Sequence, residues 1–247
     1  MIHKRQHAGS MPPARPPAAT TLSLRGRDAG ETALLAADRE KALALTPVSR
    51  ETTERLDRFV ALLLDWQRTT NLIGPATVAH LWTRHVADSL QLLQLAPNAH
   101  TWVDVGSGGG FPGLVIACAL AGSPATVHLV ESNTKKAAFL RAAQRLTEAP
   151  ALVHAERMET FAATFNEDVD VVTARALLPF KSLISLCYPL LGKTGAMALF
   201  PKGQNAGLEL EEAAKSWTMH ARLVASRTDP AGRIVVVRDV APRAKAP

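Results

Sequence analysis

Residues 103–113 read Val103-Asp-Val-Gly-Ser-Gly-Gly-Gly-Phe-Pro-Gly113, and this segment is the most informative about the fold. An apolar run at 101–105 predicts a β-strand, and the apolar residues of 111–121 predict that a helix follows the glycines. Glycines let the chain turn tightly there and let a ligand approach the backbone closely. A strand, a glycine-rich turn and a helix in this order are typical of the first unit of a doubly wound α/β sheet, where cofactors bind.

The region after this loop alternates short apolar segments with helical segments. The alternation predicts a right-handed, mostly parallel, doubly wound sheet. Two further strands lie close together at the end of the region, which predicts an antiparallel edge. The predicted strands are 101–105, 127–131, 151–155, 169–173, 196–200, 219–226 and 233–239, and the predicted helices are 111–121, 134–146, a short one ending near 165, 179–191 and 206–215.

The region before the loop predicts helices at about 49–68 and 76–95, the first with Ser49 as its N-cap. A shorter Ala/Leu-rich helix is expected at 31–45, while the proline-rich start of the chain offers little to bury. The chain therefore divides into four segments. They are a disordered or weakly ordered basic, proline-rich extension (1–45), an N-terminal helical cap (46–97), a Rossmann-like domain (98–240) and a basic tail (241–247).

The net charge of +6 is concentrated at the ends of the chain. Residues 1–50 carry +4 and residues 241–247 carry +2, so the body between them is neutral. Basic ends attract phosphate without specificity, but they serve equally well as solvated linkers, so charge alone does not indicate a nucleic-acid partner. No apolar run approaches the roughly 18 residues that a membrane span needs, and no secretory signal is evident. We therefore expect a cytoplasmic protein.

Neither cysteine indicates a special site. Cys118 and Cys187 lie in apolar stretches and are expected to be small buried hydrophobic residues. The sequence has no CxxC motif and no Cys/His cluster, so no metal site is predicted.

The glycine loop fits two cofactor motifs. Gly108, Gly110 and Gly113 match G-x-G-x-x-G, the dinucleotide fingerprint. Asp104, Gly106, Gly108 and Gly110 match D-x-G-x-G-x-G, the first motif of Rossmann-like methyltransferases. A carboxylate at Asp104 suits the cationic amino-acid end of S-adenosylmethionine and would repel a pyrophosphate. S-adenosylmethionine is therefore the expected cofactor, with an NAD-linked oxidoreductase as the alternative.

Glu131 ends the second predicted strand, which places its carboxylate over the same cleft. There it is expected to accept both ribose hydroxyl protons of an adenosyl group. NAD and S-adenosylmethionine share this group, so Glu131 does not separate the two cofactors. Asp104, Gly108 and Glu131 are the cofactor-binding candidates that this geometry supplies.

The loop after the fourth predicted strand, Thr173-Ala-Arg-Ala-Leu-Leu-Pro-Phe180, restricts the methyl acceptor. It lacks the Asn/Asp-Pro-Pro-aromatic motif used on exocyclic amines, and it has no cysteine for attack on a pyrimidine ring. It offers Arg175, which could bind the cofactor or a guanine edge, or form a salt bridge with Asp104 or Glu159. Guanine N7 has a free lone pair and no proton to remove, so its methylation needs alignment and no general base.

With these motifs in view, residues 50–240 resemble the RsmG (GidB) family of ribosomal small-subunit RNA methyltransferases, which act on guanine N7. The combination of His-x-x-Asp-Ser with Gly-Phe-Pro-Gly is specific to this resemblance. The segments that carry it are Asn71-Leu, Arg84-His-Val-Ala-Asp-Ser89, Asp104 to Gly113, Glu131-Ser-Asn-Thr-Lys-Lys136, Arg157-Met-Glu159, Ala174-Arg-Ala176 and Pro201-Lys-Gly203.

The resemblance implies a class I methyltransferase fold, S-adenosylmethionine as cofactor, and methylation of guanine 527 in 16S ribosomal RNA. The implied partner is that RNA or the small-subunit particle, with no membrane and a monomeric enzyme. Arg175 and Lys202 are the implied positioning residues. The implied cofactor pocket comprises Gly106, Phe111, Met158, Glu159 and Arg175, and the implied RNA-binding candidates are Arg84, His85, Lys202 and Arg233.

Simpler interpretations of the same residues stay open. His85 could be a packing histidine, Lys135 and Lys136 a solvated helix face, and Asp88-Ser89 a cap for local backbone. A non-catalytic RNA-binding module with this fold is the third functional hypothesis.

Overall fold

The computed structural model describes residues 29–244. Expectations for residues 1–28 and for the last three residues of the chain lie outside the described residues. Within the described range, no helix is both long and apolar enough to cross a membrane.

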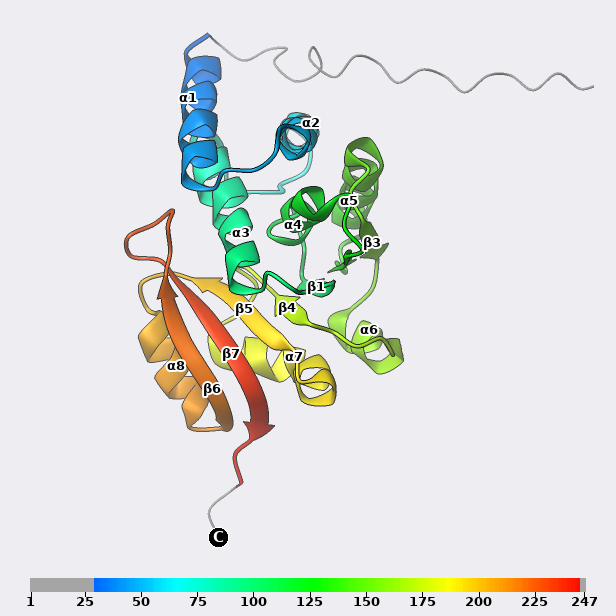
Figure 1. Ribbon diagram of the computed structural model, residues 1–247, viewed down its shortest axis with the longest axis vertical. Coiled ribbons are helices and arrows are strands. Elements are labelled where there is room, and N and C mark those ends of the chain that lie inside the picture. The colour runs from blue at the N-terminus through cyan, green and yellow to red at the C-terminus, as the bar shows by residue number, and fades with distance from the viewer. Residues whose placement is uncertain (1–28, 245–247) are drawn as a thin grey trace, which may run out of the picture.

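Seven strands form one sheet in the order β3-β2-β1-β4-β5-β7-β6 (Figure 1). Strands β1 to β5 are parallel, and β7 lies antiparallel between β5 and β6. The predicted doubly wound, mostly parallel sheet with an antiparallel edge is therefore confirmed. The strands are β1 (Thr101–Val105), β2 (Thr126–Val130), β3 (Ala151–His154), β4 (Val171–Thr173), β5 (Met197–Lys202), β6 (Trp217–Ala225) and β7 (Arg233–Pro242).

Helices cover both faces of the sheet, as Figure 1 shows. On one face, Trp102 and Leu129 pack in a core that includes Phe59 and Phe139 from the helices. The alternate residues of the same strands, such as Val103, pack on the other face. The first face carries α2 (Arg50–Trp66), α4 (Gly113–Leu120) and α5 (Thr134–Thr147), and the second carries α6 (Met158–Thr164), α7 (Phe180–Thr194) and α8 (Ala206–Ala214).

Helix α1 (Ala29–Leu45) is docked on the helical cap. The buried carboxylate of Asp38 accepts hydrogen bonds from the backbone N–H groups of Trp82 (2.8 Å) and Thr83 (3.1 Å). Arg39 forms a bidentate ion pair with Asp57 on α2, with both N–O distances 2.7 Å. The helix expected at 31–45 is therefore present as α1, whereas the expectation of a disordered or weakly ordered segment is wrong for residues 29–45. These partners lie 18 to 45 residues away along the chain, where local sequence does not reveal them.

The single helix expected at 76–95 is a series of shorter helical segments. The carboxylate of Asp38 takes the N–H groups of residues 82 and 83, which separates the first segment from the second. The second segment is a π-helix, a form that often occurs at functional sites. The segments are the 3-10 helix η1 (Pro75–His80), the π-helix η2 (Trp82–Ala87), α3 (Asp88–Leu90) and the 3-10 helix η3 (Gln91–Leu95). The N-cap of α2 is as predicted, because the Ser49 hydroxyl accepts the Thr52 N–H at 3.1 Å.

Candidate functional site

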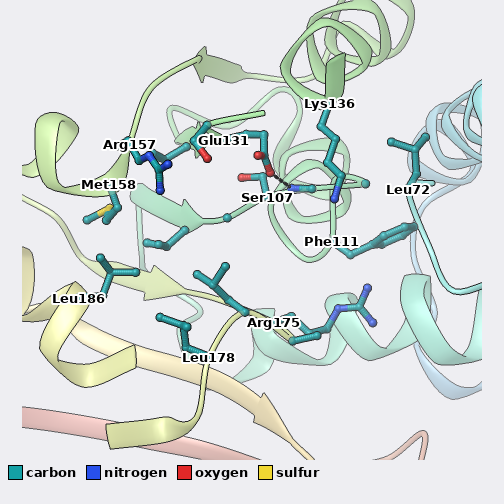
Figure 2. Close-up of a pocket in the computed structure, with 18 of the residues that line it drawn as sticks. Leu72, Ser107, Phe111, Glu131, Lys136, Arg157, Met158, Arg175, Leu178 and Leu186 are labelled. Carbon is teal, nitrogen blue, oxygen red and sulfur yellow. Dashed lines mark hydrogen bonds between the residues drawn. The ribbon is translucent and has the colours of Figure 1, made fainter. Parts of the chain in front are cut away.

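A cavity of about 560 Å³ lies at the carboxyl ends of β1, β2 and β4 (Figure 2). The glycine loop between β1 and α4 forms its floor, and the loop after β4 closes one side. The loop is fixed to the neighbouring strand because the N–H groups of Gly106 and Ser107 both donate to the Val130 carbonyl, at 2.9 and 3.1 Å. A volume of this size suits a nucleoside-sized ligand.

The structure brings almost every cofactor-binding candidate to this cavity. They come from four βα connections that are far apart in sequence, as expected for the carboxyl end of a parallel sheet. The candidates that line it are Gly106, Gly108, Phe111, Glu131, Met158, Glu159 and Arg175.

Glu131, directly after β2, holds the loop and also faces the cavity. Its Oε2 accepts the Gly108 N–H at 2.8 Å, and its Oε1 accepts the Asn133 N–H at 2.7 Å. An ionised carboxylate has about four acceptor positions, so two remain after these bonds. Acceptance of ribose hydroxyl protons by Glu131 stays a prediction, and this geometry is compatible with it.

Asp104 does not line the cavity. Its side chain is fully buried, where Oδ2 accepts the Gly113 N–H (3.1 Å) and Oδ1 accepts the Thr173 hydroxyl (2.9 Å). Burial raises the pKa of Asp104 to about 6. The structure therefore corrects the expectation that Asp104 meets the cofactor. Strand alternation turns its side chain toward α4, so it supports the loop from behind.

Arg175 and His85 both pack against the Phe111 ring in the lining of the cavity. The Arg175 guanidinium carbon lies 5.2 Å from the centre of the Phe111 ring, and the His85 ring lies 5.0 Å from it. Arg175 also donates to the Arg84 carbonyl at 3.2 Å and lies 4.0 Å from the Asp88 carboxylate. Its ion-pair partner is therefore Asp88, and neither Asp104 nor Glu159 as the sequence suggested.

His85 is neutral in the folded protein. Burial lowers the pKa of His85 to about 3, and the positive charges of Arg175 and Arg84 add to this effect. Its Nε2 pairs with the Thr77 hydroxyl at 2.8 Å. His85 thus packs against Phe111, as the simpler interpretation held, and it also borders the cavity.

The low pKa of His85 predicts a pH-dependent loss of stability. Below about pH 6.5 the unfolded chain binds a proton that the folded chain does not, so stability falls as the pH decreases. Between pH 7 and 5, we expect wild type to lose about 2 kcal/mol more unfolding free energy than His85→Gln. Denaturant titrations of both proteins measure this difference. The pH-dependent contribution of Asp104 to stability is the same in both proteins, so it drops out of the comparison. Parallel pH curves would contradict the assignment.

A second cavity of about 520 Å³ adjoins the first. The two share His85, Arg175 and Ala176, so Arg175 stands at their boundary. Ala176 has a left-handed backbone (φ 52°), which is costly for a residue with a side chain and is often found at functional sites. All four RNA-binding candidates line this second cavity, namely Arg84, His85, Lys202 and Arg233.

Two of these cations already have partners. The Lys202 ammonium donates to the Leu178 carbonyl and to Glu209, both at 2.8 Å. Arg233 donates to the carbonyls of Pro230 and Gly232, at 2.9 and 2.7 Å. Lys202 therefore fixes the loop after β4, and its proposed contact with RNA phosphate is not favoured by this arrangement. Arg84 is exposed at the cavity rim.

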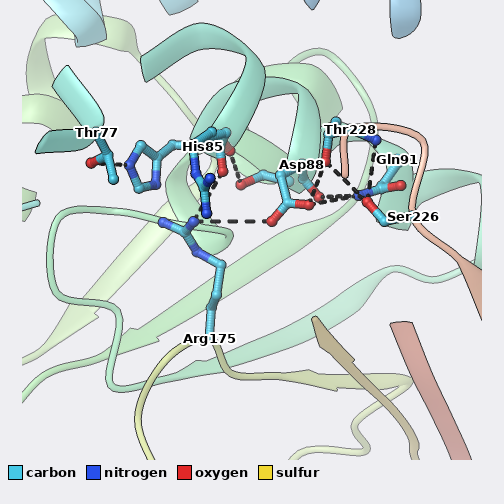
Figure 3. Close-up of polar contacts among 9 residues, drawn as sticks. Thr77, His85, Asp88, Gln91, Arg175, Ser226 and Thr228 are labelled. Atoms are coloured by element: carbon cyan, nitrogen blue, oxygen red, sulfur yellow. Dashed lines mark hydrogen bonds and ion pairs between the residues drawn. The ribbon is translucent and has the colours of Figure 1, made fainter. Parts of the chain in front are cut away.

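A polar network connects α3 to the loop between β6 and β7 (Figure 3). The Asp88 Oδ1 accepts from Gln91 Nε2 (2.8 Å) and from the Thr228 hydroxyl (2.9 Å). Gln91 also accepts the Arg227 N–H at 2.9 Å. The adjacent Ser89 hydroxyl donates to the His85 carbonyl at 2.6 Å. Ser89 thus bonds local backbone as the simpler interpretation held, whereas Asp88 connects distant segments.

Several cavity residues were not foreseen from the sequence. Residues 72–74, from the loop after α2, reach across to the glycine loop. A Cβ at Gly109 would lie 2.9 Å from the Leu72 carbonyl oxygen, so glycine is required there by the cap. Lys136, in the first turn of α5, also lines the cavity (Figure 2). Lys136 and Leu72 both lie in segments that carry the family resemblance, which was an available signal, but the contact of Leu72 with Gly109 could not be predicted from them.

The cysteines are buried, as predicted. Burial raises the pKa of Cys118 to about 12, so its thiol is unreactive. Within residues 29–244, no group of three or more His, Cys, Asp or Glu side chains is placed to hold a metal ion.

The chain matches the family described as rRNA small subunit methyltransferase G over residues 52–230. It is 58% identical over 205 residues to "Ribosomal RNA small subunit methyltransferase G" of Bradyrhizobium sp. strain BTAi1, covering 83% of this chain and 92% of that protein. It is 57% identical over 210 residues to the protein of the same name from Rhodopseudomonas palustris strain BisB18, covering 85% and 89%.

Solved structures share the fold at low sequence identity. A putative O-methyltransferase from Klebsiella pneumoniae has a TM-score of 0.55 at 12% identity, covering 85% of this chain and 99% of that one. An O-methyltransferase from Bacillus cereus, solved in complex with SAH, has a TM-score of 0.53 at 14% identity, covering 85% and 100%. These likenesses show the Rossmann-like methyltransferase fold.

Proposed function

The chain belongs to the rRNA small subunit methyltransferase G (GidB) family, and on that basis we propose that it methylates N7 of a guanine in 16S ribosomal RNA. It is an S-adenosylmethionine-dependent methyltransferase of small-subunit ribosomal RNA. The choice of guanine N7, the monomeric state and the cytoplasmic location are parts of the proposal.

The pair of adjoining cavities is the observation that carries this proposal. The first has the Glu131 carboxylate beside the glycine loop, and the second has the cationic rim. Arg175 borders both, so a cofactor in the first cavity and a base in the second would meet at its guanidinium. Two reactants held side by side in this way react as in a unimolecular step.

The cofactor pocket fits S-adenosylmethionine by its chemistry. Two acceptor positions on Glu131 suit ribose hydroxyls, and Phe111 and Met158 offer apolar contact. When bound, S-adenosylmethionine supplies an electrophilic methyl group on a sulfonium. Arg175 is fixed by Phe111, Arg84 and Asp88, and thereby positions the guanine that enters from the second cavity.

Neither the matched family nor the two O-methyltransferase structures described above supports the NAD-linked alternative. Calorimetric titration with S-adenosylhomocysteine and with NADH tests it directly, and binding of NADH alone would overturn the methyltransferase assignment.

The non-catalytic alternative is tested by transfer of a labelled methyl group to small-subunit RNA and to assembled particles. Mapping the labelled nucleotide and its modified atom tests the N7 proposal, and a label on any other atom would refute it.

The proposed chemistry predicts a methyl transfer rate that is nearly independent of pH. Guanine N7 has no proton to lose, and His85, with a pKa of about 3, does not titrate near neutrality. At saturating substrates we expect the single-turnover rate to vary by less than about twofold between pH 6.5 and 8.5, a range that would reveal an ordinary histidine. Quenched-flow measurement with labelled cofactor gives this rate. A tenfold rise per pH unit would indicate a general base.

A further inference from the structure

We propose that Asp88 and Arg175 together read the target guanine in the second cavity. The Asp88 Oδ2 accepts the guanine N1–H and N2–H protons, and Arg175 donates to O6. This inference rests on the proposed function, since it names the residues that select the acceptor base.

Asp88 has one oxygen committed to the protein and one directed at the cavity. Its Oδ1 is held by Gln91 and Thr228, and Asp88 lines the second cavity (Figure 3). Among residues 29–244, no hydrogen-bond donor reaches Oδ2, and its nearest recorded cation is Arg175 Nη1 at 4.0 Å. The two bonds to Oδ1 fix the carboxylate, so Oδ2 is preorganised to accept from a ligand.

The order of groups along the cavity matches the edge of guanine. Arg175 lies at the boundary with the cofactor cavity, and Asp88 lies beyond it. Around its edge, guanine presents the acceptors N7 and O6 first, followed by the donors N1–H and the 2-amino group. With N7 toward the first cavity, O6 faces the Arg175 donor and N1–H faces the Asp88 acceptor.

The same pair rejects adenine. Adenine has an amino donor in place of O6 and an acceptor at N1. Its amino group would therefore face the Arg175 donor, and its N1 would face the Asp88 acceptor, so neither pair could form a hydrogen bond. Polar groups that the bound base covers but leaves unpaired are unfavourable, which makes this discrimination effective. The second acid in the cavity, Asp229, is less suitable because, among residues 29–244, no ion pair joins it to Arg175, whereas the Asp88 carboxylate lies 4.0 Å from Arg175 Nη1.

The test places guanosine or inosine at the target nucleotide of ligated 16S RNA assembled into small subunits. Inosine keeps N7, O6 and N1–H but lacks the 2-amino group. We expect wild type to methylate guanosine about 10- to 100-fold faster than inosine, the effect of one hydrogen bond to a charged group. In Asp88→Asn, this ratio should fall below about threefold. The asparagine amide can donate to O2 of xanthine, so this variant should also act on xanthosine faster than wild type does.

Asp229→Asn is the matched control, because it removes the same charge from the same cavity. It should keep the wild-type ratio of guanosine to inosine. Thr228→Val removes a support of Oδ1 without altering Oδ2, so it should slow both substrates and leave the ratio nearly unchanged. An unchanged ratio in Asp88→Asn, or a reduced ratio only in Asp229→Asn, would overturn the inference.

A target containing 7-deazaguanosine separates this inference from the proposed function. That base keeps every group that Asp88 and Arg175 would read but has no N7 acceptor. Methylation of it by wild type would refute the N7 proposal, while the ratio of guanosine to inosine would still test the contact with Asp88.

Discussion

Replacing Glu131 with glutamine should weaken the binding of S-adenosylhomocysteine by about 100-fold or more. The glutamine amide nitrogen cannot accept a hydrogen bond, so either the Gly108 N–H or the Asn133 N–H loses its acceptor. The change also removes the charge that strengthens bonds from ribose hydroxyls, each worth about 1.5–3 kcal/mol. A loss of about 2.7 kcal/mol corresponds to 100-fold in affinity. Isothermal titration calorimetry measures it.

Glu211→Gln is the control for this prediction. It is the same substitution, made at an exposed position on α8. It should leave affinity unchanged within about twofold. The unbound Glu131→Gln protein should also lose about 1–3 kcal/mol of stability from the unsatisfied loop N–H. If affinity is retained while stability falls, Glu131 supports the loop and does not bind the cofactor.

Replacing Gly113 with alanine should reduce the free energy of unfolding by about 3 kcal/mol or more. Gly113 is the first residue of α4, and a Cβ there would lie 2.6 Å from both Cβ and Oδ2 of Asp104. Overpacking a buried site costs about 1–3 kcal/mol, and displacing Asp104 would also break its bonds to Gly113 and Thr173. Denaturant unfolding at pH 7.5 measures the loss.

Gly207→Ala provides the opposite expectation within the same protein. A Cβ at Gly207 meets no atom within 4 Å, and the residue lies in the first turn of α8. Alanine there should leave stability unchanged or raise it by about 0.5 kcal/mol. Equal effects of the two substitutions would contradict the close packing of Gly113 against Asp104.

The strands of the sheet and their mostly parallel direction could be predicted from the sequence, because hydrophobic periodicity and chain connectivity are local properties. The five parallel strands and the closing antiparallel pair are present within a few residues of their expected limits. The helix expected at 76–95 could not be divided correctly. Its interruption depends on the Asp38 carboxylate, which approaches from a helix more than 40 residues earlier.

The candidate site was predicted in part. Residues of the βα loops could be assigned because strand ends in a parallel sheet meet at one edge, which places Gly106, Glu131 and Arg175 together. Asp104 was assigned to the cofactor because it directly precedes the glycine loop. The sequence does not show to which side of the strand its side chain points. Asp104 lies on the face of β1 that α4 covers, so its carboxylate points toward α4 and not into the cavity.

The doubly wound sheet, the glycine loop and the family could all be predicted before the structure, since they follow from local pattern and motif. The contact of Leu72 in the cap with Gly109, and the position of Arg175 between two cavities, became visible only in the folded chain. The same holds for Asp88, whose Oδ1 is held by Thr228 while the residue lines the second cavity. These contacts join segments up to 140 residues apart, and their geometry is set by packing of whole elements rather than by neighbouring residues.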